Sequence, residues 1–192
     1  NRLTRELRAL SNCNQALMRA ESEQTLLDKI CSIVCDTAEY RLAWVGLIDN
    51  TNKLRVNVVS QAGSGEHFTD NVTYFISQKE ETPIDIAVWK KKHSITPDFA
   101  KVTRGSLWSN YAGTYGCRSA IALPLLDNEG SVLGILAIYS IEMNVFEDEE
   151  IKLLRELAGE RYTRYSDYPF HRTKAASRIC KPRYRRRLSM GD

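Results

Sequence analysis

The sequence has no long apolar run, no secretory signal and no paired cysteines. No run approaches the roughly 18 to 20 apolar residues that span a bilayer, and the N-terminal segment NRLTRELRAL is charged throughout. The five cysteines are odd in number, scattered and without CxxC spacing. We therefore expect a cytoplasmic protein without a membrane span, whose reduced thiols act as small apolar fillers of the core.

Catalytic and metal-binding motifs are also missing. The sequence contains no phosphate-binding loop, no HExxH and no Ser/His/Asp spacing, and its three histidines are isolated from one another. A lone histidine in a loop is more often a surface residue than a ligand. These absences predict a module that is not an enzyme and that carries no metal or cofactor.

The composition is that of a globular domain with a basic tail. Hydrophobic residues make up 43% and charged residues 27% of the 192 residues, which excludes wholesale disorder. The net charge of +3 hides an asymmetry between the body and the tail. Residues 161–192 hold 10 Lys/Arg and 2 Asp, whereas residues 1–160 hold 17 Lys/Arg and 22 acids.

Two apolar runs, residues 119–126 and 132–139, predict an antiparallel hairpin with Asp-Asn-Glu-Gly in its turn. Both faces of the second run are apolar, so this strand should lie near the middle of a sheet that is covered on both sides. Pro124 cannot donate to a strand ladder, so the first strand should break or reach an edge there.

The remaining patterns give the order of elements around this hairpin. Helical patterns cover residues 3–20, 22–37, 82–90, 105–116 and 147–158. Strand patterns cover residues 40–48, 54–61, 72–76 and 93–96. This order predicts an α+β domain with a central antiparallel sheet and a helix at each end of the chain. The two end helices lie close together if they cover the same face.

The first helix carries a heptad seam. Spacings of four and three residues separate Leu3, Leu7, Leu10, Asn14 and Leu17. Such a seam predicts that residues 1–20 form a signalling helix that packs against its own copy in a homodimer, with one Asn that fixes the register. The alternative is a helix that lies on its own domain.

Five segments carry a resemblance to a known family. They read LSNCNQALMRAESEQTLLDKICSIV, YRLAWVGL, CRSAIALPL, GSVLGILAIYS and FEDEEIKLLRELA. In this order and with these gaps they resemble the GAF domains of bacterial sensory proteins, and we assign residues 21–159 to such a domain. The resemblance implies a central antiparallel sheet of five to six strands. The terminal helices would lie on one face, and short helices and loops would form a pocket on the other.

The resemblance also implies a function. GAF domains of this type commonly lie N-terminal to histidine kinase or diguanylate cyclase domains, in two-component or cyclic di-GMP signalling. They transmit signals through their end helices. The implied partners are a second copy of the chain, an unidentified small molecule and a downstream output domain. We therefore expect a sensory or regulatory module of a larger bacterial signalling protein.

The sequence departs from several GAF subgroups. The Gly-x-Gly-Pro-x-Gly loop of many relatives is replaced by EETPID at residues 80–85, which keeps only the proline. No Cys-His pair follows Pro97-Asp98, which argues against bilin attachment. GAF-fold methionine sulfoxide reductases use several pocket cysteines, and Cys117 is the one candidate here. A thiol-based redox enzyme or sensor that uses Cys117 is therefore a second hypothesis.

Aromatic and polar side chains cluster in the segment that builds the pocket wall of a GAF domain. Aromatic rings with a few polar groups are typical of small-ligand pockets. The candidate ligand-binding residues are Trp89, Asp98, Trp108, Tyr111, Tyr115, Arg118 and Ser119. The alternative is that these rings only fill the side of the sheet that lacks long helices.

The last segment, residues 160–192, differs from the rest. Pro169 and Pro182 bar a continuous helix, and we expect this basic tail to be poorly ordered. Its cations and interleaved aromatic rings are of the kind that bind nucleic acid or another anionic surface. The interpretation that we favour is a misread or frame-shifted continuation with no evolved function, because the composition changes abruptly in the middle of an expected helix.

Overall fold

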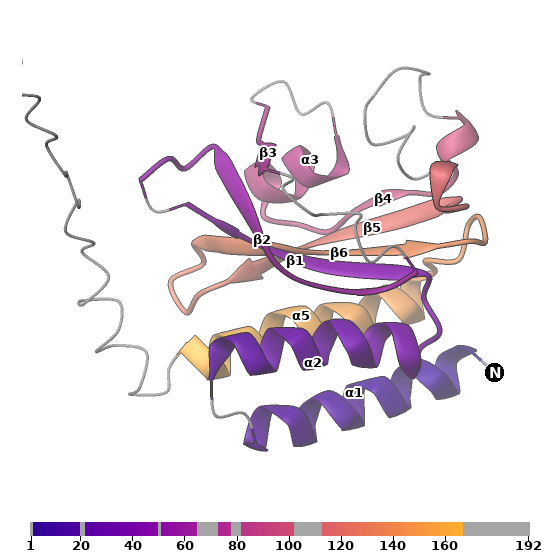
Figure 1. Cartoon of the computed structure of the whole chain (residues 1–192), viewed down its shortest axis with the longest axis horizontal. Helices are drawn as coiled ribbons and strands as arrows, with labels where there is room; N and C mark the ends of the chain where they lie inside the picture. The colour runs from indigo at the N-terminus through magenta and orange to yellow at the C-terminus, as the bar shows by residue number, and fades with distance from the viewer. Residues whose placement is uncertain are drawn as a thin grey trace, which may run out of the picture.

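The computed structural model describes residues 2–19, 22–49, 51–64, 73–77, 82–101 and 113–166. Within them, a six-stranded sheet has the order β3-β2-β1-β6-β5-β4 (Figure 1), and every pair of neighbouring strands is antiparallel. The strands are β1 (Leu42–Ile48), β2 (Arg55–Gly63), β3 (Thr73–Phe75), β4 (Ser94–Thr96), β5 (Ser119–Leu126) and β6 (Val132–Ser140). The predicted α+β fold with a central antiparallel sheet is confirmed.

Two long helices, α2 (Glu23–Asp36) and α5 (Asp148–Ser166), cover one face of the sheet, and a third, α1 (Arg2–Arg19), packs against them on the side away from the sheet (Figure 1). Shorter pieces cover the other face, namely α3 (Pro83–Lys90) and the 3-10 helix η1 (Phe99–Lys101). The end helices α1 and α5 lie side by side and run in the same direction. None of the helices in the described ranges has the length and apolarity of a membrane span.

Helix α5 is longer than the sequence pattern indicated. It continues past Gly159 to Ser166, into the segment that we expected to begin the basic tail. The remainder of that tail, residues 167–192, lies outside the described part of the chain.

The β5–β6 hairpin is the centre of the fold, as its sequence predicted. Side chains of β6 alternate between two buried layers, with Leu136 and Ile138 toward the long helices and Ile135 and Tyr139 toward α3. The neighbour β4 pairs with residues 120–122 of β5. Pro124 lies beyond the end of β4. It therefore has no β4 residue opposite it to which an N–H group would have to donate.

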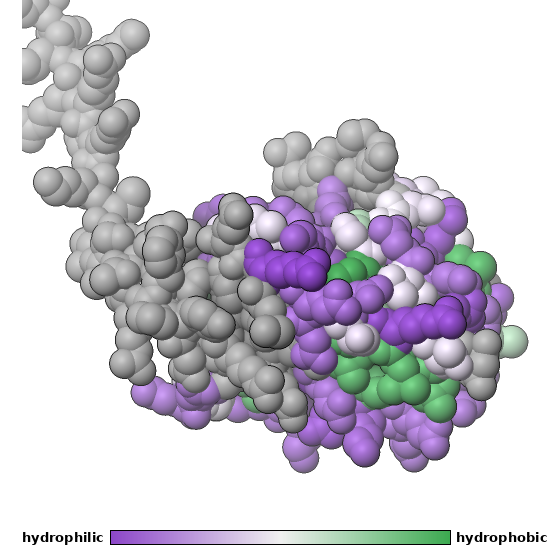
Figure 2. All heavy atoms as spheres, turned by 90° about the horizontal axis from the view of Figure 1, so that it is seen from below, coloured by the Kyte–Doolittle hydropathy of each residue, from purple (hydrophilic) through white to green (hydrophobic). Residues whose placement is uncertain are grey.

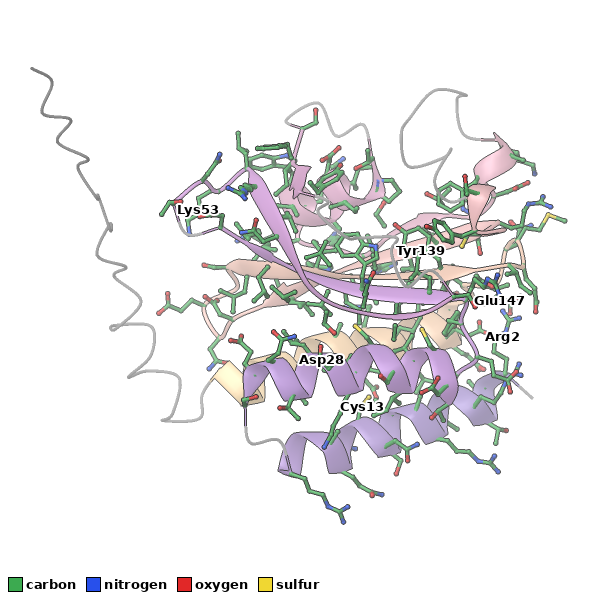
Figure 3. All side chains as sticks on the ribbon, in the orientation of Figure 1. Arg2, Cys13, Asp28, Lys53, Tyr139 and Glu147 are labelled. Carbon is green, nitrogen blue, oxygen red and sulfur yellow. The ribbon has the colours of Figure 1, made fainter. Side chains whose placement is uncertain are left out.

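Helix α1 rests on the domain through small side chains. Ala9, Cys13 and Ala16 are buried in the layer formed with α2 and α5, and Cys13 points from α1 toward that layer in Figure 3. Of the seam residues, Leu7 is 50% exposed and Asn14 is exposed, whereas Leu10 is partly buried and packs against this layer. The helix therefore lies on its own domain and still exposes Leu7 and Asn14 of the seam.

Candidate ligand-binding site

An ion pair joins two of the predicted site residues on the α3 side. Asp98, which follows β4, is only 4% exposed and accepts hydrogen bonds from Nη2 and Nε of Arg118 at 3.2 and 3.3 Å. It also accepts the backbone N–H of Ala100 at 3.1 Å. The Ala100 N–H and the Arg118 guanidinium lower the pKa of Asp98, although burial opposes them. Asp98 is therefore an ionised acid at neutral pH that holds Arg118 in place.

The guanidinium of Arg118 is open to solvent on its remaining edge. Its side chain is 46% exposed, and Nη2 also contacts the Met143 sulfur at 3.7 Å. The Arg118 carbonyl accepts the N–H of Phe99 at 2.7 Å, so the backbone on both sides of the ion pair is fixed. An anchored, half-exposed guanidinium can bind a carboxylate, phosphate or carbonyl group of a small ligand.

Two further predicted residues, Ser119 and Tyr115, have structural partners. Ser119 is fully buried, and its hydroxyl donates to the Glu142 carbonyl at 2.6 Å, across the connection between β6 and α5. Tyr115 is partly buried, and its carbonyl accepts a hydrogen bond from Nε of Arg41 at 3.3 Å. These contacts give both residues a part in positioning the segment around Arg118.

The other three predicted residues do not join this ion pair in the described structure. Trp89 lies on α3, is 43% exposed and donates its indole N–H to the Ser77 carbonyl at 2.8 Å. Trp108 and Tyr111 belong to residues 102–112, which lie outside the described part of the chain. The structure therefore brings Asp98 and Arg118 together, while the Ser119 side chain bonds to the Glu142 carbonyl instead.

The described part of the α3-side layer is filled by side chains. Trp44 of β1 is fully buried at its centre, and Phe99 stacks on Tyr139 with ring centroids 6.2 Å apart. Figure 3 shows Tyr139 on this side of the sheet. In this part of the layer the aromatic rings pack against one another. Residues 102–112, a further wall of the predicted pocket, lie outside the described ranges.

A second buried carboxylate on this side, Asp85, was not predicted from the sequence. It is fully buried in the first turn of α3 and accepts hydrogen bonds from the N–H groups of Ser77 and Thr82 and from the Tyr74 hydroxyl, at 2.8 to 2.9 Å. The Thr82 hydroxyl accepts the Asp85 N–H in return, at 3.2 Å. This is a capping box, and its Thr-x-x-Asp spacing was the available sequence signal.

The described cysteines are poor candidates for thiol chemistry. Cys117 lies in the α3-side layer, whereas Cys13, Cys31 and Cys35 lie in the layer beneath the long helices, so the sheet separates them. Burial raises the pKa of Cys117 to about 11 and those of Cys31 and Cys35 to about 12. These thiols are protonated at neutral pH, and a thiol must ionise before it acts as a nucleophile.

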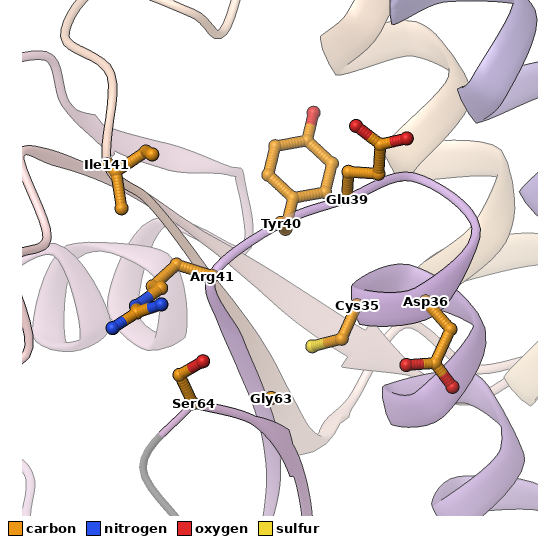
Figure 4. A pocket seen from close by; sticks show the side chains of 8 residues that line it. All are labelled: Cys35, Asp36, Glu39, Tyr40, Arg41, Gly63, Ser64 and Ile141. Carbon is orange, nitrogen blue, oxygen red and sulfur yellow. The ribbon is translucent and has the colours of Figure 1, made fainter.

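A cleft of about 350 Å³ opens where α2 ends and β1 begins (Figure 4). Its lining comes from three separate segments of the chain, so the sequence pattern did not reveal it. The lining residues are Cys35, Asp36, Glu39, Tyr40, Arg41, Gly63, Ser64 and Ile141. None of the predicted site residues belongs to this lining.

Comparison with known proteins identifies the fold. A family model described as GAF domain matches residues 20–160. The GAF domain region of a putative membrane protein from Geobacter sulfurreducens shares 21% sequence identity with a TM-score of 0.62, covering 79% of this chain and 94% of that one. The GAF domain of a phosphoenolpyruvate-protein phosphotransferase from Coxiella burnetii shares 16% identity with a TM-score of 0.70, covering 91% and 98%.

An enzyme has a similar fold. Free methionine-R-sulfoxide reductase from Neisseria meningitidis, solved with its substrate, shares 14% identity with a TM-score of 0.72, covering 91% of this chain and 94% of that one. No curated protein matches the sequence significantly. At such identities the solved structures show a common fold, and the family model, which matches most of the chain, shows the family. The chain belongs to the GAF domain family.

Proposed function

We propose that this GAF domain is a sensory module of a larger bacterial signalling protein and that it works as a homodimer through α1. The observation that carries the proposal is the orientation of α1. Its small residues, such as Ala9 and Cys13, face the domain, while Leu7 and Asn14 of the seam are exposed. Viewed from the helix side, the surface is mostly hydrophilic and includes an apolar area (Figure 2).

Pairing of two seams supplies a large apolar gain. Full burial of one leucine is worth about 1.5–3 kcal/mol, and Leu7 leaves half of its surface exposed in the single chain. Asn14 is exposed on the same side, where a single polar residue can set the register of two helices at some cost in stability. A second copy of α1 is therefore the occupant that fits this side.

The end helices also provide a route for a signal to leave the domain. α1 and α5 contact each other, and α5 continues past Gly159 to Ser166. A change in dimer packing along α1 is therefore passed directly to α5. We propose that a downstream output domain, such as a histidine kinase or diguanylate cyclase, receives that change.

The proposed input is a small ligand at Arg118. The support is the anchored guanidinium, which Asp98 holds at 3.2 Å and which remains about half exposed. A panel of small anionic metabolites should contain a compound that changes tryptophan fluorescence in the wild type and not in the Arg118→Gln variant. Equal responses in both proteins would remove Arg118 from the site.

The dimer is tested by light scattering. Deletion of residues 1–19, or the single substitution Leu7→Glu, should give a folded monomer. Gln15→Glu introduces the same charge at an exposed position away from the seam and should leave the dimer intact. If the chain stays dimeric without residues 1–19, the seam is not the interface.

The thiol-based alternative has the fold of the Neisseria reductase in its favour. The raised pKa of Cys117 and its separation from the other described cysteines weigh against it. A methionine sulfoxide reductase assay on the wild type and the Cys117→Ser variant decides between the sensory module and the thiol-based enzyme. Activity that Cys117→Ser abolishes would favour the enzyme.

A further inference from the structure

We infer that the cleft between α2 and β1 binds a small organic carboxylate, held by Arg41 and Ser64. This site is separate from Arg118 and goes beyond the proposed function, because none of its lining residues belongs to the Asp98–Arg118 pair. Its volume, about 350 Å³, is at the lower end of the range for ligand pockets, which suits a molecule of a few heavy atoms.

The floor of the cleft depends on the absence of a side chain at position 63. Gly63 has a φ of +98°, and a Cβ there would lie 2.4 Å from the Arg41 carbonyl oxygen and 2.9 Å from the Cys35 sulfur. The next residue, Ser64, donates its N–H to the same Arg41 carbonyl at 2.9 Å. The close approach that only glycine permits therefore brings Ser64 next to Arg41.

Arg41 is fixed in a pose that leaves most of its guanidinium available. Its backbone N–H donates to the Tyr139 carbonyl at 2.9 Å, and its Nε donates to the Tyr115 carbonyl at 3.3 Å. The side chain as a whole is exposed. In Figure 4 the guanidinium lies on the same side of the cleft as the Ser64 hydroxyl. A guanidinium anchored at Nε can present its two Nη groups to one carboxylate.

The positive charge of Arg41 is not neutralised within the described part of the chain. Glu39 forms an ion pair with Arg5 of α1, and the Asp36 carboxylate points away from Arg41 on the far side of the cleft (Figure 4). Burial raises the pKa of Cys35 to about 12, so this thiol adds no negative charge at neutral pH. An anionic group is therefore the natural partner for Arg41.

The rim of the cleft also has an apolar side. Ile141 lines it and is 57% exposed, whereas the ring of Tyr40 is buried and stacks on Phe146, with centroids 5.7 Å apart. A short aliphatic tail on the ligand would cover Ile141. These groups together fit a short-chain monocarboxylate, with its carboxylate on Arg41 and Ser64 and its tail against Ile141.

The test is an NMR titration of the full chain with butyrate, and with butyramide as an isosteric neutral control. Butyrate should cause saturable shifts of the Ser64 amide and the Arg41 Nε–H, and butyramide should not. Because hydrogen bonds to a charged group are stronger than those between neutral groups, Arg41→Gln should weaken binding about tenfold or more. Arg41→Lys, which keeps the charge without the planar fork, should weaken it less.

A control variant and the choice of probes separate this site from others. Arg55→Gln removes an exposed cation at the other end of β2 and should leave butyrate binding unchanged. The Ser64 amide and the Arg41 Nε–H lie in this cleft, so their shifts report on this site whether or not a ligand binds at Arg118. The inference is overturned if butyramide binds as well as butyrate or if no saturable shift appears. It is equally overturned if Arg41→Gln and Arg55→Gln weaken binding to the same extent.

Discussion

The layer beneath the long helices and the layer beneath α3 are built from different side chains. The first is largely aliphatic, with Leu136, Ile138 and Leu154 among its buried residues. The second contains Trp44 and Tyr139, and the segments that cover it contribute the carboxylates Asp85 and Asp98, both buried. The two faces of one sheet are therefore stabilised by different means.

The length of the covering elements explains this difference. A long helix satisfies most of its backbone groups internally, so its contact with the sheet can be purely apolar. The α3 face is covered by a helix of 8 residues and a 3-10 helix of 3 residues, and short elements leave many N–H groups unpaired. Asp85 and Asp98 accept such groups, from Ser77, Thr82 and Ala100. On this face, buried Asp side chains thus accept N–H groups that a longer helix would pair internally.

Removing the largest side chain of the α3-side layer should have the largest effect. Trp44→Ala empties a fully buried position and should lower the free energy of unfolding by about 3–5 kcal/mol, measured by urea denaturation. Leu136→Ala, on the other face of the sheet, should cost about 2–5 kcal/mol. Trp89→Ala, at a half-exposed position, should cost about 1 kcal/mol. A Trp44→Ala cost as small as that of Trp89→Ala would mean that the α3-side layer contributes little to stability.

Removing a buried polar group from the same face should have the next largest effect on the free energy of unfolding. Asp85→Ala removes the acceptor for the Ser77 and Thr82 N–H groups and should cost about 2–4 kcal/mol. The control is Asp28→Ala on α2, where the carboxylate is exposed and accepts one bond from Gln24, with an expected change within about 0.5 kcal/mol. Equal effects of the two substitutions would contradict a structural role for buried charge.

The hairpin and the helices could be predicted because their signals are local. Apolar runs on both faces placed β6 in the middle of the sheet, and the heptad spacing found α1. The spacing of leucines alone could not show that Ala9, Cys13 and Ala16 face the domain, because that choice depends on how closely α1 approaches α2 and α5. For such a close approach small side chains fit better than leucines.

The candidate site was only partly predictable for a related reason. Asp98 and Arg118 were chosen for their residue types, and their pairing depends on β4 lying next to β5. The cleft at Arg41 depends on Gly63 and Ile141, which lie far from it in the sequence. Contacts of this kind arise from strand order, which residue patterns indicate only indirectly.

Lowering the pH should reduce the stability of the α3 face, because it protonates Asp98. Its pKa in the folded chain lies below the usual value, chiefly because of the Ala100 N–H and the Arg118 guanidinium. The stabilisation is therefore present above the unfolded-state pKa of about 3.9 and is lost as the pH falls through the folded-state value. The urea midpoint of the wild type should fall as the pH drops below about 4, and that of Asp98→Asn should fall less over the same range. Parallel pH profiles of the two proteins would contradict this role.

The smallest effect is expected where α1 meets the rest of the domain. The Arg2–Glu142 ion pair, at 2.5 Å, links α1 to the connection between β6 and α5, and the Glu142 side chain is 62% exposed. Arg2 and Glu147 lie at the same end of the molecule in Figure 3. Exposed pairs are screened by water and salt and contribute about 0–1 kcal/mol.

A double-mutant cycle with Arg2→Gln and Glu142→Gln measures this contribution. The coupling free energy should be below about 1 kcal/mol at low salt and should vanish near 1 M NaCl. If it does, the docking of α1 depends on the small apolar contacts of Ala9, Cys13 and Ala16, as expected for the helix-covered face. A coupling that is larger and independent of salt would show that charge fixes elements on both faces, and the contrast between them would no longer hold.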